Sequence, residues 1–325
     1  FAIPFWFNYV AGKITNFSFA PASILMSFLL ISLPSICWAA VLPLVQKKAD
    51  ASLRGKVLMV STLGNLAGVY LISFLMIPHF GLTSTWMFLG LLSSIGALVL
   101  YRDKAGLMVT VFLVLLSVIF IWRHQTDSSV VFNQESPYQK VSVVKNGDGL
   151  EFALDGNAQF AIFPGMVRDP KELSYFNFAI DTPKLVPAES SLELLNLGLG
   201  GGYVPHFWKK EFPNANITSV EIDPFVIQAS QLVFPSLMQE SAIQNMDARL
   251  FLQKSSKKYD VILVDAYFSS FIPYHLMSSE FFTLLQNHLN QGGLVVFNFL
   301  QSFKDSGLYD DLLFTLSKRF HFIRH

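Results

Sequence analysis

The sequence predicts an N-terminal α-helical transmembrane domain, a small antiparallel β unit, and a C-terminal α/β domain built on a parallel sheet. Three observations support this prediction. Long apolar stretches fill the first part of the chain, a middle part alternates apolar and polar residues around turn signals, and the last part alternates apolar strands with amphipathic helices. We therefore expect domains at 1–125, 126–180 and 181–325.

Charge is sparse and unevenly spread along the chain. Only 14% of the 325 residues are charged, whereas an ordinary soluble domain carries about 25%. Residues 1–125 hold eight basic and two acidic side chains, and because the formal net charge of the whole is zero, the remainder carries −6. No strongly basic patch is present, so nucleic acid is not an expected partner.

Four apolar stretches have about the 20-residue length that a transmembrane helix needs. They cover about 20–45, 57–77, 83–101 and 105–122. Basic residues gather in the first and third connections, which places those loops in the cytosol, yet four full crossings would put the following residues outside. Either one of these segments does not cross the membrane, or helices upstream of Phe1 change the count. We expect an integral protein of the inner or plasma membrane, in contact with the bilayer, with its α/β domain in the cytosol.

The middle of the chain reads as a β unit over about 130–164. Apolar and polar residues alternate there around "NGDG" and "DGN", which are hairpin turn signals. From residue 190 onward, apolar strands alternate with amphipathic helices, which is typical of a parallel sheet covered on both faces.

Glycines cluster where the first of these strands ends. Four of them occupy five positions in "LLNLGLGGGY": Gly198, Gly200, Gly201 and Gly202. Glycine weakens a strand or a helix, so such a cluster indicates a required backbone shape or a close approach to a ligand. A glycine loop between the first strand and a helix is typical of a nucleotide site. Tyr203 stands where a dinucleotide fingerprint needs its third glycine, which weakens an NAD interpretation.

Acidic residues follow the ends of the next three strands. Glu221 comes nineteen residues after Gly202 and is followed by Asp223, Asp247 lies near the third strand end, and Asp265 follows the fourth. A carboxylate at the second strand end can accept hydrogen bonds from ribose hydroxyls. One such acid alone is explained as well by a turn or a helix cap. Their order after a glycine loop predicts a nucleoside site.

The order of these motifs resembles the class I S-adenosylmethionine-dependent fold, which is Rossmann-like. More narrowly, the chain resembles the spermidine synthase (polyamine aminopropyltransferase) family over about 130–325, and its build is similar to the membrane-fused branch of that family. The segments that carry the resemblance are "ESPYQKVSVV", "LDGNAQFA", "LGLGGGYVP", "VEIDP", "YDVILVDA" and "IPYHLMSSEFF".

The resemblance implies a transferase that moves an aminopropyl group from decarboxylated S-adenosylmethionine to an amine, without a metal. It implies Asp265 as the catalytic base and Tyr175, in "KELSYFNF", as a second catalytic residue. It also implies a set of donor-binding residues: Gln139, Gly198, Gly200, Gly201, Gly202, Glu221, Asp223, Asp247 and Ala248. By the habit of the family, the protein is expected to form homodimers.

The sequence departs from the family pattern on the acceptor side. Phe176 and Asn177 stand where the family has His and Glu, Tyr203 replaces an Asp, and Phe268 replaces a second acid. A diamine needs carboxylates to pair its ammonium groups, because a buried unpaired charge is costly. Aminopropyl transfer therefore remains the first hypothesis. S-adenosylmethionine-dependent methyl transfer to a hydrophobic acceptor is an alternative, and a non-catalytic nucleotide-sensing membrane protein is another.

Overall fold

The computed structural model divides the chain into two compact units, Phe1–Asp127 and Ser128–His325. The residues that it describes are 42–43, 45–47, 50–100, 108, 111, 115, 129–166, 174–187, 191–267, 272–299 and 308–320. The predicted division of the second unit near residue 180 stays a prediction.

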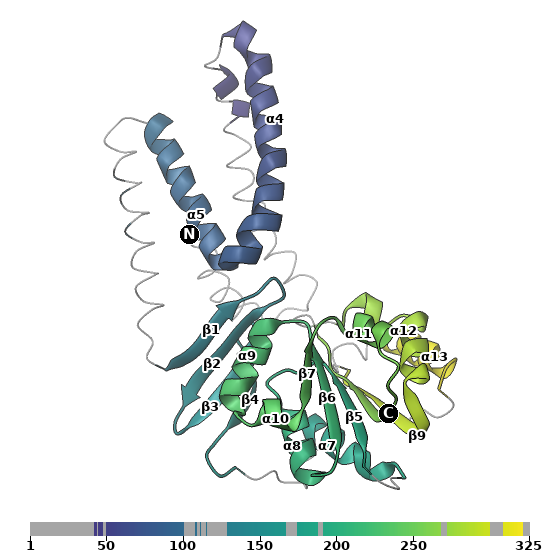
Figure 1. Cartoon of the computed structure of the whole chain (residues 1–325). Helices are drawn as coiled ribbons and strands as arrows, with labels where there is room; N and C mark the ends of the chain where they lie inside the picture. The colour runs from purple at the N-terminus through teal and green to yellow at the C-terminus, as the bar shows by residue number, and fades with distance from the viewer. Residues whose placement is uncertain are drawn as a thin grey trace. The chain divides into compact units, whose positions relative to one another are not determined.

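The described part of the first unit is a bent pair of helices. The 3-10 turn η2 (Ala51–Leu53), helix α4 (Arg54–Tyr70) and the π-helical segment η3 (Leu71–Met76) lead into helix α5 (Ile77–Leu100). Gly81 interrupts α5 with non-helical dihedrals, φ 77° and ψ 169°. Figure 1 shows α4 and α5 as the two arms of a V that meet at this bend.

One helix among the described residues, Ala51–Gly81, is long and apolar enough to cross a membrane, with a mean hydropathy of 1.7. It contains the stretch predicted at 57–77. The stretch predicted at 83–101 is helical up to Leu100 as part of α5. The stretches predicted at 20–45 and 105–122 lie almost wholly outside the described residues.

The second unit begins with a four-stranded antiparallel sheet in the order β1-β2-β3-β4. Its strands are Val130–Glu135, Lys140–Asn146, Gly149–Leu154 and Asn157–Ile162. The turns at the predicted signals hold Gly147 and Gly156 at positive φ, as tight hairpins require. Val141, Val143 and Phe152 are fully buried on one face of this sheet. They join the hydrophobic core that α8 (Tyr203–Glu211) and α9 (Pro224–Val233) also share.

The larger sheet is parallel, which confirms the predicted α/β architecture. Its strand order is β7-β6-β5-β8-β9. The strands are β5 (Glu193–Leu197), β6 (Asn216–Glu221), β7 (Ala242–Asn245), β8 (Tyr259–Val264) and β9 (Leu289–Phe297). β6 and β7 follow on one side of β5, and β8 and β9 then follow on its other side. The strand order therefore reverses between β5 and β8. Ligands bind at such a switch point, beyond the carboxyl ends of the strands.

Helices cover both faces of the parallel sheet (Figure 1). Leu194 and Leu195 are neighbours on β5 but enter two different hydrophobic clusters, because successive strand residues face opposite sides. The first cluster takes side chains from α7 (Tyr175–Asp181), α8 (Tyr203–Glu211) and α9 (Pro224–Val233). The second takes them from α11 (Ala248–Lys254), α12 (Ser279–Asn287) and α13 (Leu308–Ser317). Short helical turns complete the unit: η4 (Thr182–Leu185), α10 (Leu237–Glu240) and η5 (Tyr274–Leu276).

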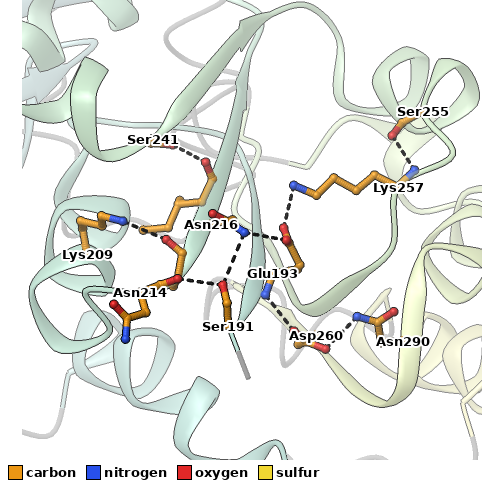
Figure 2. Close-up of polar contacts among 12 residues, drawn as sticks. Ser191, Glu193, Lys209, Asn214, Asn216, Ser241, Ser255, Lys257, Asp260 and Asn290 are labelled. Atoms are coloured by element: carbon orange, nitrogen blue, oxygen red, sulfur yellow. Dashed lines mark hydrogen bonds and ion pairs between the residues drawn. The ribbon is translucent and has the colours of Figure 1, made fainter. Parts of the chain in front are cut away.

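A polar network closes the amino ends of the strands (Figure 2). The Glu193 backbone N–H donates to Asp260 Oδ2 at 2.8 Å, and Asn290 Nδ2 donates to Asp260 Oδ1 at 2.8 Å. Asn216 Nδ2 donates to Glu193 Oε1 at 2.8 Å, and Lys257 Nζ lies 2.6 Å from Glu193 Oε2. These polar residues join β5, β6, β8 and β9 at one edge. The predicted site residues that follow these strands lie at the opposite, carboxyl ends.

Candidate functional site

The glycine loop begins at a close approach between two strand ends. Gly198, directly after β5, has φ 98°, and an added Cβ would overlap the backbone of Asp265. The Gly198 N–H donates to the Val220 carbonyl at 2.8 Å, and the Asp265 N–H donates to the Leu197 carbonyl at 2.8 Å. Glycine is therefore needed here to let the ends of β5 and β8 meet.

The next glycines have different surroundings. An added Cβ at Gly201 would overlap the ring of Phe160, and one at Gly202 would lie 2.6 Å from Leu237 Cδ2. At Gly200, in contrast, no described residue lies within 4 Å of the added Cβ. The loop thus packs against protein at two positions and leaves backbone open at Gly200, where a ligand can approach without an intervening side chain.

Glu221 links the glycine loop to the end of β6. Its Oε2 accepts a hydrogen bond from the Leu199 N–H and its Oε1 accepts one from the Asp223 N–H, both at 2.9 Å. The side chain is buried, and burial raises its pKa to about 7, although the backbone hydrogen bonds oppose this shift. A carboxylate has about four acceptor sites, so Glu221 keeps capacity for further donors such as hydroxyl groups.

Asp223, which was predicted to bind the donor, makes its hydrogen bonds to protein groups. It is fully buried, its Oδ2 accepts from Ser136 Oγ at 2.6 Å, and its Oδ1 accepts from the Phe225 N–H at 2.9 Å as the N-cap of α9. The Ser136 hydroxyl in turn accepts from the Gln139 N–H at 3.0 Å. Asp223 therefore fastens the β1–β2 loop, which carries Gln139, beside the end of β6.

Asp247 and Ala248 begin α11 just after β7. Asp247 Oδ1 caps this helix by accepting from the Leu250 N–H at 2.9 Å. Its Oδ2 lies 2.9 Å from His275 Nε2, and Arg249 Nη1 donates to the His275 carbonyl at 3.0 Å. Ala248 is buried. A nucleobase amino group at Asp247 would therefore share the Oδ2 atom with His275 or displace this side chain.

Asp265 and Tyr175 come together although they lie far apart in the sequence. Asp265 follows β8, and burial raises its pKa to about 6 against the effect of hydrogen-bonding neighbours. Tyr175 begins α7, and its buried hydroxyl has no well-aligned hydrogen bond within the described part of the chain. Burial first, and then the nearby Asp265 charge, raise the pKa of Tyr175 above its ordinary value.

Asn298 is a site residue that the sequence prediction does not include. Its Nδ2 donates to Asp265 Oδ1 at 2.8 Å. Asn298 comes directly after β9, just as Asp265 comes directly after β8. A polar residue after the apolar run "LVVF" was therefore a signal that could have identified it.

An aromatic cluster adjoins Tyr175. Phe176 and Tyr203, two of the departures from the family pattern, contact each other with ring centroids 4.8 Å apart. Tyr175 contacts Phe176 at 5.4 Å, and Phe160 contacts Tyr203 at 5.2 Å. Asn177 is buried within α7, and Phe268 lies outside the described residues. Among the described residues, aromatic side chains therefore form the side of the site next to Tyr175.

The fold and the site together define a class of protein. A parallel sheet with this strand order, a glycine loop after its first strand and acidic residues after the following strands form a class I methyltransferase-like nucleotide-binding domain. Within this class, residues 198–320 match the family described as "Spermine/spermidine synthase domain". This likeness covers residues 198–320, which is less than half of the chain.

Curated relatives carry related names. A "Probable polyamine aminopropyl transferase" of Bifidobacterium longum is 33% identical over 53% of this chain and 38% of its own length. A "Polyamine aminopropyltransferase" of Vibrio vulnificus is 30% identical over 57% of this chain and 62% of its own length. One from Oceanobacillus iheyensis is 26% identical over 90% of this chain and 64% of its own length. The chain thus spans less than two thirds of each of these relatives.

Solved structures give a weaker likeness. Spermidine synthase from Thermotoga maritima has a TM-score of 0.49 and 22% identity, over 60% of this chain and 65% of its own. The assignment of the fold rests on the strand order rather than on this likeness.

Proposed function

We propose that this protein is a membrane-anchored aminopropyltransferase that uses decarboxylated S-adenosylmethionine as its donor and an amine as its acceptor. The observation that carries the proposal is the coincidence of the family match over residues 198–320 with a half-buried carboxylate, Asp265, at the switch point of the sheet. The names of the curated relatives agree with it.

The reaction needs a nucleophilic amine and a way to remove its proton. The acceptor nitrogen attacks the aminopropyl carbon bonded to the sulfonium, and a C–N bond forms while the C–S bond breaks. The bonding electrons go to sulfur, which leaves methylthioadenosine as a neutral thioether. The surplus proton on nitrogen passes to Asp265, whose pKa of about 6 leaves it ionised at neutral pH and able to act as a base.

The donor would be held along the carboxyl ends of β5, β6 and β7. The open backbone at Gly200 suits close approach of the nucleoside, and Glu221 keeps acceptor sites that suit ribose hydroxyls. Asp247 Oδ2 suits an adenine amino group. We retain Gln139 as a donor contact because the Ser136–Asp223 bond holds its loop beside β6. We omit Asp223 because its side chain is fully buried as well as bound to two protein donors.

The acceptor would meet both charge and aromatic surface. Asp265 can pair one ammonium group, whereas Phe176 and Tyr203 beside Tyr175 offer ring faces and edges. We therefore infer an amine with an apolar portion next to its reacting nitrogen. Ring faces also attract cations, which is a second way for such a wall to hold an amine.

The anchor would be the helix of the first unit. Only 6% of its most apolar segment is buried. Apolar side chains such as Leu63, Val69 and Phe74 are exposed along it. Water does not favour such a surface, whereas lipid does. Homodimer formation stays a prediction.

The purified protein should be offered both S-adenosylmethionine and its decarboxylated form, with single amines and with diamines such as putrescine. We expect methylthioadenosine by mass spectrometry, and a loss of at least about 100-fold in Asp265→Asn, because a general base contributes that much. Asp260→Asn is the matched control, since Asp260 lies on the same strand and also accepts from an asparagine of β9. It should keep its turnover.

Two results would contradict the proposal. Formation of S-adenosylhomocysteine in place of methylthioadenosine would make the protein a methyltransferase. Binding of nucleotide without either product, in wild type and Asp260→Asn alike, would favour a sensor.

A further inference from the structure

Asn298 is held in a fixed position at the end of β9. Its backbone N–H donates to the Val264 carbonyl at 3.0 Å, which extends the pairing of Val264 with Phe297 by one residue. Its own carbonyl accepts from the Tyr267 hydroxyl at 2.8 Å. Asn298 and Asp265 are therefore neighbours on adjoining parallel strand ends.

This placement brings the Asn298 amide to one oxygen of Asp265. Nδ2 donates to Oδ1 at 2.8 Å, within the range of a good N–H···O hydrogen bond. An amide N–H donor fixes the rotation of the carboxylate about its last torsion angle. The other oxygen, Oδ2, is not bound by Asn298.

We propose that Asn298 is a positioning residue for the transfer reaction: it binds Oδ1 of Asp265 so that Oδ2 is directed at the acceptor amine. This inference deepens the proposed function and rests on it for its kinetic consequence. Its effect on the Asp265 carboxylate does not depend on which acceptor is used.

The charge state of Asp265 supports this assignment. A donor to a carboxylate favours its ionised form, and the hydrogen bond from Asn298 is the largest influence that lowers the pKa of Asp265 against burial. The titratable groups that face Asp265 from the packed elements described are Tyr175 on α7 and, beyond it, Tyr267. Both are neutral tyrosines near neutral pH. Asn298 is thus the neighbour whose removal should change Asp265 most.

The test compares two asparagines on the same strand. Asn298→Leu removes the donor to Asp265 and keeps a side chain that branches at Cγ. Asn290→Leu removes an equivalent donor to Asp260. This hydrogen bond is also 2.8 Å long, and it lies at the opposite, amino ends of the same two strands. Figure 2 shows Asn290 with Asp260. Both variants lose one Asn–Asp hydrogen bond between β8 and β9, but one of them touches the proposed base.

We expect the acid limb of the kcat/KM profile to move to higher pH by about one unit in Asn298→Leu, and kcat to fall about 10-fold or more at acidic pH while the donor KM stays constant. Asn290→Leu should leave the profile in place. Asn298→Gln, which keeps an amide, should recover part of the rate. A uniform loss at every pH, equal in both variants, would overturn the inference.

Direct titration of Asp265 separates this inference from the proposed function. NMR of protein labelled with ¹³C at aspartate carboxyls, assigned by comparison with Asp265→Asn, reports the pKa of Asp265 without turnover. A rise in Asn298→Leu but not in Asn290→Leu supports the role of Asn298 even if no aminopropyl transfer is found. An unchanged pKa overturns it even if transfer is found.

Discussion

Two carboxyl groups at strand ends, Glu221 and Asp265, have raised pKa values because burial disfavours their charged forms. In each group, hydrogen bonds that stabilise the ionised carboxylate oppose this rise in the pKa. Glu221 receives backbone N–H groups from the glycine loop and from its own strand end, whereas Asp265 receives a side-chain amide from β9. The first arrangement suits a binding group, and the second suits a base.

The pKa of about 7 makes Glu221 the residue that should give nucleotide binding its pH dependence. Ribose hydroxyls donate to the ionised form, so the affinity for methylthioadenosine should fall by up to about tenfold for each pH unit below this pKa. Calorimetry between about pH 5 and pH 8 measures this slope, in an Asp265→Asn background that removes the second titration. Glu221→Gln should bind more weakly at pH 8 and lose the slope.

Stability gives the matching readout for Glu221. The folded protein holds this proton more tightly than an unfolded chain, whose glutamate has a pKa near 4.5. The free energy of unfolding should therefore decrease by on the order of 3 kcal/mol, through this residue alone, as pH rises from about 4.5 to 7. If the affinity for methylthioadenosine keeps the same pH slope in Glu221→Gln, another group causes the pH dependence of binding.

The strand ends explain how much of the site the sequence could predict. Residues that directly follow apolar runs, such as Gly198, Glu221 and Asp265, were identified because a parallel sheet gathers its carboxyl ends at one edge. Asp223 satisfied the same pattern, yet it caps α9 and binds Ser136. A single sequence does not distinguish a cap from a ligand, because both are acids after a strand.

Other contacts depend on strand pairing and could not be predicted. The register that places Asn298 beside Asp265 joins two strands separated by a whole helix, and no local pattern specifies it. The contact between Phe176 and Tyr203 likewise joins α7 to α8. The fold class was predictable because periodicity repeats over many residues, whereas each of these pairs is one contact.

The glycine loop offers a test at the scale of the element. In Gly198→Ala, the new Cβ would overlap the Asp265 backbone, so we expect a loss of at least about 2 kcal/mol in the free energy of unfolding. In Gly200→Ala, no described residue lies within 4 Å of the new Cβ. We therefore expect a loss of only about 1–2 kcal/mol in the free energy of unfolding, which is the cost of an alanine in a left-handed backbone conformation. Urea unfolding measures both losses.

Nucleotide binding should separate the two variants further. Gly200→Ala should weaken methylthioadenosine binding by about tenfold or more, because its methyl group enters open space that we assign to the ligand. Wild-type affinity in Gly200→Ala would mean that the nucleoside does not approach the loop at this position.

The two units of the molecule differ in how they treat their apolar side chains. The described helix of the first unit exposes apolar side chains, whereas the second unit buries a core on each face of its parallel sheet. We predict that the full chain stays in the membrane pellet after an alkaline carbonate wash and dissolves only in detergent. Residues 128–325 expressed alone form a natural comparison, because they make up one compact unit.

Orientation can be tested on the same molecule, since the chain has one cysteine, Cys37. In a Cys37→Ser background, a cysteine placed at the exposed Lys145 should react with a membrane-impermeant maleimide only after the cells are lysed. The donor is a cytosolic metabolite, so the proposed reaction requires this result. Labelling in intact cells would place the transferase unit outside and remove the donor from its reach. Release by carbonate would instead refute the anchor while leaving the chemistry of the second unit intact, because its site residues all lie within Ser128–His325.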